Sequence, residues 1–154
     1  MGILTDDMQR VVLEQRLGFI ATVCPDGTPN LSPKGTTTVW DDDHLVFADI
    51  YSPGTVTNLQ QNPAIEINVV DPDVRKGYRF KGTAIVLTEG AQFEEIVAFY
   101  RKRGTQYAIH SVVLMTVERA LPVVSPAYDS GASEDEIRGR WQSYRESLGS
   151  ETKL

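Results

Sequence analysis

The chain alternates short apolar runs with turn-forming residues along most of its length. In some segments apolar and polar residues alternate, and in others apolar residues run together, over lengths typical of strands. The residues between them, such as Pro25-Asp26-Gly27, have the chemistry of tight turns. This pattern predicts six strands, at 17–24, 29–40, 45–50, 64–70, 78–88 and 110–117.

Four other segments repeat their apolar residues at intervals of three and four, which places those residues on one face of a helix. Three of them begin with residues that favour a helix N-terminus: Thr5, Ser52 followed by Pro53, and a capping box that opens at Ser133. We therefore predict helices at 5–17, 52–62, 93–104 and 133–148.

The predicted order is rich in strands and has short connections. Six strands in an open sheet would leave long unpaired edges that need protection, whereas a barrel pairs most of them. We therefore expect a closed or nearly closed antiparallel β-barrel, with the first helix as a lid.

The segment after the last predicted strand differs in character. Residues 122–131 predict irregular structure, and the helix that follows carries only a narrow apolar stripe. A narrow stripe packs on a surface rather than inside a core, and Trp141 and Tyr144 within it would make a good dimer contact. We expect a barrel domain at 1–121 and a C-terminal extension at 122–154, whose helix packs on the barrel or on a dimer partner.

Composition narrows the class of protein. A chain of 154 residues with 41% hydrophobic and 23% charged residues fits one globular domain. Its net charge of -6 argues against binding to nucleic acid or to an anionic membrane. Cys24 is the only cysteine, so an intrachain disulfide is impossible. With no basic, apolar leader at the start and no long apolar run, we expect a cytoplasmic protein.

Two segments have the chemistry of an anion site. In the second strand, Pro33 and Gly35 flank Lys34, and such residues mark an edge, a bulge or a close approach of backbone to a ligand. The helix that starts at Ser52 offers unpaired N–H groups, and Gly54 leaves their approach open. The alternative for the first segment is an edge strand that Pro33 and Lys34 protect against aggregation. The alternative for the second is an ordinary helix cap that binds nothing.

A third segment is a local basic patch. Arg79 and Lys81 share one face of the fifth predicted strand. This pair suits a phosphate or carboxylate partner. The alternative is that both side chains are simply solvated. The sequence has no dinucleotide fingerprint, no phosphate loop and no paired histidines with zinc spacing. We therefore predict no metal site and name no catalytic acid or base.

The run from about Gly18 to Val86 resembles the flavin-binding split-barrel family related to pyridoxamine 5'-phosphate oxidase. The resemblance lies in the order of a strand, a Gly turn, a strand with Pro and Lys, an apolar strand and a short helix. That helix reads Ser52-Pro53-Gly54-Thr55-Val56-Thr57-Asn58-Leu59-Gln60-Gln61-Asn62-Pro63, and Arg79-Phe80-Lys81-Gly82-Thr83-Ala84 is similar to the family's Arg-x-x-Gly-x-Ala strand.

The resemblance implies a mainly β fold, a six-stranded antiparallel split barrel of Greek-key type. Helices would lie at the N-terminus, after the third strand, before the last strand and at the C-terminus. It also implies a homodimer that holds flavin mononucleotide (FMN) between its subunits. Many relatives have a basic residue where Thr55 stands, so Lys34 would have to compensate, helped by Arg79 or Lys81. The implied cofactor positions are Ser32, Pro33, Lys34, Gly35, Thr36, Asp49, Ser52, Gly54, Thr55, Asn58, Arg79 and Lys81.

The expected function is that of a flavin-dependent oxidoreductase with a small-molecule substrate or electron donor, in which the cofactor does the chemistry. The alternatives are a flavin-binding electron carrier without turnover, and a flavin-free structural or ligand-sensing dimer on the same barrel. A deazaflavin or haem in place of FMN, as in some relatives, also stays open.

Overall fold

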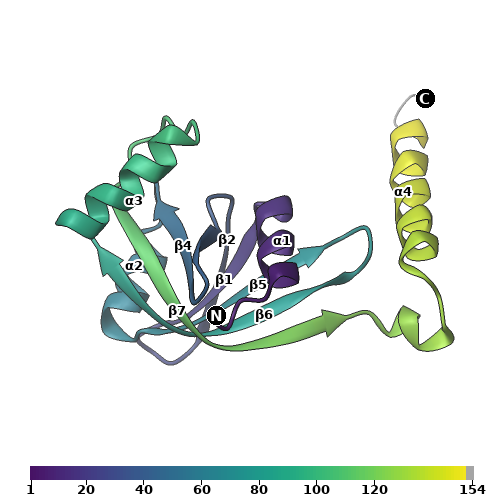
Figure 1. Cartoon of the computed structure of the whole chain (residues 1–154), viewed down its shortest axis with the longest axis horizontal. Coiled ribbons are helices and arrows are strands. Elements are labelled where there is room, and N and C mark those ends of the chain that lie inside the picture. The colour runs from purple at the N-terminus through teal and green to yellow at the C-terminus, as the bar shows by residue number, and fades with distance from the viewer. Residues whose placement is uncertain (152–154) are drawn as a thin grey trace.

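The computed structural model describes residues 1–151 as one curved antiparallel sheet with helices at its margins (Figure 1). Within these residues, no helix combines the length and the apolar character needed to cross a bilayer. The strands are β1 (Gly18–Val23), β2 (Pro29–Lys34), β3 (Thr38–Asp41), β4 (His44–Asp49), β5 (Ala64–Asp71), β6 (Lys76–Leu87) and β7 (Ser111–Val124). The helices are α1 (Asp6–Gln15), α2 (Pro53–Gln61), α3 (Ala91–Lys102), the short 3-10 helix η1 (Pro126–Ser130) and α4 (Glu134–Glu151).

The order of the strands shows how the sheet closes. The order is β2-β1-β5-β6-β7-β4-β3, so β2 and β3 are its two edges. These edges are consecutive in the chain and only residues 35–37 join them. Because so short a link cannot span an open seven-stranded sheet, the sheet must curl until its edges meet. The result is the split β-barrel that the sequence predicted.

The strand count differs from the prediction of six. The segment predicted as one strand, 29–40, forms β2 and β3, because its first half pairs with β1 and its second half with β4. The chain turns between them at Gly35, where the Thr37 amide and hydroxyl both donate to the carbonyl of Lys34. The turn is the corner at which the chain passes from one edge of the sheet to the other.

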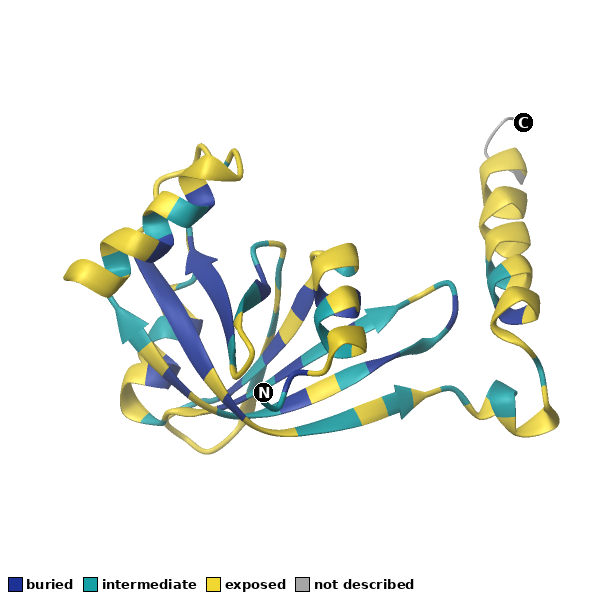
Figure 2. Cartoon of the chain, viewed as in Figure 1, coloured by how far each residue is buried: buried dark blue, intermediate teal, exposed yellow. Residues whose placement is uncertain are grey.

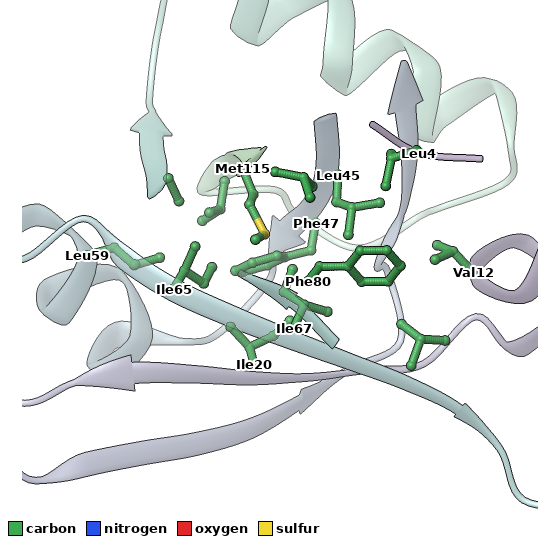
Figure 3. Packing of buried hydrophobic residues seen from close by; sticks show 14 of the residues in the cluster. Leu4, Val12, Ile20, Leu45, Phe47, Leu59, Ile65, Ile67, Phe80 and Met115 are labelled. Carbon is green, nitrogen blue, oxygen red and sulfur yellow. The ribbon is translucent and has the colours of Figure 1, made fainter. Parts of the chain in front are cut away.

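The barrel interior is a continuous apolar core (Figure 3). Phe47 and Phe80 lie at its centre, both fully buried, with Ile20, Ile67 and Met115 around them. Helix α1 adds Val12 beside this cluster, as the predicted lid requires, and Thr5 accepts a hydrogen bond from the Met8 amide as its N-cap. Burial of this one core is the main force that fixes the curved sheet.

A second buried cluster lies on the opposite face of β4 and β7. Val46 and Val112 of the two strands pack against Ile96 and Tyr100 of α3. Both faces of β4 are therefore covered, and five of its six residues are buried (Figure 2). This packing explains why the sequence of β4 is continuously apolar rather than alternating.

Strand β7 is longer than predicted. The apolar pattern predicts a strand that ends at Val117 and irregular structure at 122–131, but β7 pairs with β6 as far as Val124. Beyond Thr116 only β6 pairs with it, since β4 ends its pairing there. Pro122 is tolerated because a strand with one open edge can lose a ladder donor. The β5–β6 hairpin and β7 thus form an arm that extends from the barrel (Figure 1).

Helix α4 lies at the far end of this arm rather than on the barrel body (Figure 1). Its capping box is present as predicted, with reciprocal hydrogen bonds between Ser133 and Glu136. Ile137 is fully buried, and the Arg75 guanidinium lies 3.6 Å from the centre of the Trp141 ring. Tyr144 contacts the edge of that ring but is itself exposed.

Candidate functional site

The end of β2 provides a half-buried cation. Ser32 faces the barrel interior, since it pairs with the buried Ile20 of β1, and Lys34 lies two residues on along the same face. The Lys34 ammonium donates to the Ser32 hydroxyl over 2.6 Å. Burial lowers the pKa of Lys34 below its usual 10.5, while the charge of Asp49 opposes that shift. Lys34 is thus a charged donor with reduced access to water, close to the start of α2.

The β2–β3 corner is fixed to the end of β4. The Thr36 hydroxyl oxygen lies 3.0 Å from the amide nitrogen and 3.2 Å from the carbonyl oxygen of Ala48. From the other side, the Tyr100 hydroxyl donates to the Thr36 carbonyl over 2.7 Å. Burial raises the pKa of Tyr100 well above its usual 10, so this phenol stays a neutral donor. The corner therefore holds Lys34 in register with the residues that follow β4.

Asp49 organises the turn between β4 and α2. Its carboxylate accepts from the Ser52 amide over 2.7 Å and from the Ser111 hydroxyl over 3.0 Å. Both acceptor oxygens are therefore committed to the protein. The N-cap lies at Ser52 as predicted, but the Ser52 side chain makes no capping hydrogen bond. The Ser52 hydroxyl is left available.

The start of α2 is open to an approaching group. An added Cβ at Gly54 would meet nothing within 4 Å, and Pro53 at the first position lacks an amide hydrogen. Gly54 therefore carries no side chain that would block the first turn of α2, where the positive end of the helix dipole lies. Thr55 and Asn58 are buried along this helix, and the Asn58 amide donates to Thr22 over 3.0 Å and to Cys24 sulfur over 3.6 Å.

The structure links the two predicted phosphate elements through Asp49, which lies near Lys34 and bonds to Ser52, but leaves the basic patch apart. Arg79 and Lys81 lie on β6, three strand spacings of about 4.8 Å from β2. Both already contact Glu66, at 2.7 and 3.5 Å, and Arg79 lowers the pKa of that carboxyl. Within one chain they therefore do not share a phosphate with Lys34.

Two hollows adjoin the corner. One, of about 800 Å³, lies between Gly35, Thr36, Ile50 and the loop after α3, and a smaller one of about 110 Å³ lies beneath the three threonines 36–38. Arg103 lines both and donates to the Thr38 hydroxyl over 2.8 Å. Among the described residues, none with a carboxylate lines either hollow. The sequence analysis missed Arg103, because a basic residue at a helix C-terminus is ordinary.

These residues suit a phosphorylated ligand by the chemistry of their donors. A half-buried ammonium, a free hydroxyl at Ser52 and open amides at a helix start are the groups that bind phosphate in proteins. Gly54 leaves room for it. Asp49 is adjacent and negative, but its oxygens are turned to Ser52 and Ser111. The described residues gather no group of three or more potential metal ligands.

Comparison with known proteins places the chain among relatives of one type. Residues 4–127 match the family model described as Pyridoxamine 5'-phosphate oxidase. An uncharacterized protein of Methanocaldococcus jannaschii is 32% identical over 89 residues. That match covers 56% of this chain and 58% of the relative, so the chain spans little more than half of the curated protein it matches.

Solved structures agree with the match. HupZ of group A Streptococcus is 33% identical, with a TM-score of 0.73 over 80% of this chain and 96% of that one. An FMN-binding protein of Syntrophomonas wolfei has a TM-score of 0.66 at 18% identity, over 79% of this chain and 87% of that one. At that identity the second likeness concerns the fold alone.

Proposed function

We propose that this chain, which belongs to the pyridoxamine 5'-phosphate oxidase family, binds FMN and acts as a flavin-dependent oxidoreductase on a small molecule. The observation that carries the proposal is the half-buried Lys34 beside the open start of α2. The fold that the chain shares with the FMN-binding protein of Syntrophomonas wolfei supports it. When bound, the flavin would supply hydride or electron transfer, and no side chain need supply an acid or base.

In this proposal the FMN phosphate is held by Lys34, the Ser52 hydroxyl and the free amides of the first turn of α2. A single full positive charge serves the phosphate, since Thr55 is neutral and buried. Asp49 is a positioning residue that sets the entry of α2 through Ser52 and Ser111. At the corner beside Pro33, the amides of Gly35 and Thr36 would be the backbone donors toward the flavin ring.

The substrate would occupy the hollow next to the corner. That hollow shares Gly35 and Thr36 with the proposed cofactor site, so a molecule in it lies beside the flavin. Arg103 gives it a positive wall, and no carboxylate among the described residues lines it. A small anionic substrate fits this chemistry best.

We further propose that the protein acts as a homodimer with the cofactor at the subunit interface. The outer face of β1 and β2 exposes Phe19 (41% exposed) and Leu31 (66%), with Leu17 beside them. Large apolar residues gathered on one exposed face are typical of a subunit contact. The contact lies next to β2, the strand that carries Lys34.

The first experiment is the visible spectrum of the purified protein, followed by titration with FMN and with riboflavin, which lacks the phosphate. We expect flavin absorption, and FMN binding tighter than riboflavin binding. A deazaflavin or haem spectrum, or colourless protein that FMN does not saturate, would reject the cofactor. If flavin binds, turnover of a reduced nicotinamide with a natural oxidant separates an oxidoreductase from an electron carrier.

A further inference from the structure

A hollow lies on the outer face of the sheet, on the side away from the barrel core. Its volume is about 480 Å³, and it is lined by residues of β1, the β1–β2 turn, the first residue of β2, β5, β6 and β7. Small residues at its floor, Ala21, Ala64 and Gly82, leave the space unfilled. The flavin site proposed above uses none of these residues.

The strand register makes this hollow apolar at one end and charged at the other. Ala21 pairs with Glu66, Glu66 with Lys81, and Lys81 with Arg119, so these side chains form one row across the outer face. On the β1 side the lining is Val23 and Pro29, and on the β6–β7 side it is Lys81 and Arg119. A ligand that lies along this row meets both kinds of surface.

Two cations face each other at the charged end. Lys81 and Arg119 are cross-strand partners, an arrangement that is unfavourable for like charges unless an anion lies between them. Glu66 gives one carboxylate oxygen to Arg79 and the other to Lys81. Arg119 makes no ion pair with any described residue.

The remaining acid of the lining does not neutralise the pair. Glu118 contacts the Thr83 hydroxyl over 3.4 Å and makes no ion pair among the described residues. The lining itself holds two cations, Lys81 and Arg119, and two carboxylates, Glu66 and Glu118. Because Glu66 is shared with Arg79, which lies outside the lining, Arg119 is the cation whose charge no ion pair among the described residues offsets.

A β-bulge creates the pairing of the two cations. Lys81 pairs with Arg119 but the next residue, Gly82, pairs with Val117, so Glu118 is the extra residue. A Cβ at Gly82 would lie 2.0 Å from the Thr116 carbonyl oxygen, so only glycine fits. Bulges commonly re-aim side chains beside binding sites. Here the bulge brings Arg119 opposite Lys81 at the mouth of the hollow.

From these observations we propose that the outer hollow binds a small carboxylate with an apolar body. The carboxylate lies between Lys81 and Arg119, and the apolar body lies over Ala21, Val23 and Ala64. Such a ligand relieves the repulsion between the cations and covers the apolar floor at the same time. The hollow shares no residue with the flavin site proposed above, and it lies on the same outer face of β1 and β2 as the proposed dimer contact.

The test uses 2-naphthoate as an apolar carboxylate and 2-naphthylmethanol as its neutral counterpart, each titrated by fluorescence against the purified full chain. We expect saturable binding of the naphthoate and weaker binding of the alcohol. R119Q and K81Q should each weaken naphthoate binding on the order of 10-fold and leave the alcohol unchanged. A64F, which fills the hollow at an exposed position, should weaken both.

Lys102, an exposed lysine on α3, provides the matched control, since K102Q removes the same charge elsewhere. FMN titration of R119Q in parallel keeps the two proposals distinguishable, and we expect it to match the unmodified chain. Naphthoate binding that is not saturable, or that R119Q and A64F leave unchanged while circular dichroism shows them folded, would overturn the proposal. So would a loss of equal size in K102Q.

Discussion

Replacing Lys34 with methionine removes the charge on which the proposed phosphate site depends while keeping an unbranched side chain. A hydrogen bond to a charged group contributes about 1.5 to 3 kcal/mol. Since 1.4 kcal/mol is a factor of ten in affinity, FMN binding should weaken about 10- to 150-fold. Riboflavin has the same ring but no phosphate, so its affinity should stay within about twofold.

The free protein should tolerate this change. Burial lowers the pKa of Lys34, which means that the folded chain disfavours its charged form. K34M should therefore leave the thermal unfolding midpoint unchanged or raise it slightly. The contact to Ser32 that is lost is partly exposed, and the Ser32 hydroxyl can turn to water.

The pH dependence gives a second signature. Because the pKa of Lys34 is below 10.5, FMN affinity should begin to fall at a pH below that value as the ammonium loses its proton. Riboflavin corrects for titration of the shared ring, so the ratio of the two affinities reports on the phosphate contact. In K34M this ratio should not change with pH.

Fluorescence titration with both flavins, from pH 7 to 10.5, measures all of these quantities. Equal losses of FMN and riboflavin affinity in K34M would show that Lys34 does not act on the phosphate. An unchanged FMN affinity would remove it from the site.

Three further changes test the surrounding structure. T36V loses the hydroxyl that bonds to β4 and should lower the free energy of unfolding by about 1 to 3 kcal/mol. T36S keeps the hydroxyl and should not lower it. Equal urea unfolding curves for the two variants would contradict this. Arg79 holds the pKa of Glu66 below its usual value, so this pair stabilises the fold at neutral pH and its contribution is lost as the pH falls through that lowered pKa. E66Q should thus have a free energy of unfolding lower by at most about 1 kcal/mol at pH 7. If the free energy of unfolding is still lower by the same amount at pH 2, the ion pair is not its cause. W141A removes the ring over Arg75 and should speed proteolysis of α4; cleavage as slow as in the unmodified chain would refute this contact.

Local patterns predicted most of the secondary structure. The hairpin around Gly27, the capped helices that open after Thr5 and Ser133 and the short α2 helix depend on residues within a few positions of one another. The same short-range chemistry is the basis for proposing that Lys34 and the start of α2 bind an anion. Such features are readable because turn, cap and periodicity preferences act over one or two turns of chain.

Pairing partners decided what the sequence could not. Residues 29–40 read as one strand because nothing local shows that the two halves pair at opposite edges of the sheet. Residues 122–131 were predicted to be irregular, although a strand with one open edge accepts Pro122 and β7 runs to Val124. Arg103 was missed because its relevance depends on the distant Thr38, which it reaches only in the folded chain.

The division between sequence and structure is clearest at the two basic elements. The sequence by itself determined that Lys34 lies next to chain-bending residues and that Arg79 and Lys81 share a strand face. Only the tertiary structure decided that Lys34 lies near Asp49, whose carboxylate bonds to the start of α2, and that the other pair faces outward beside Glu66 and Arg119. The physical reason is that side-chain periodicity is local, whereas the order and register of strands arise from burying one core shared by the whole chain.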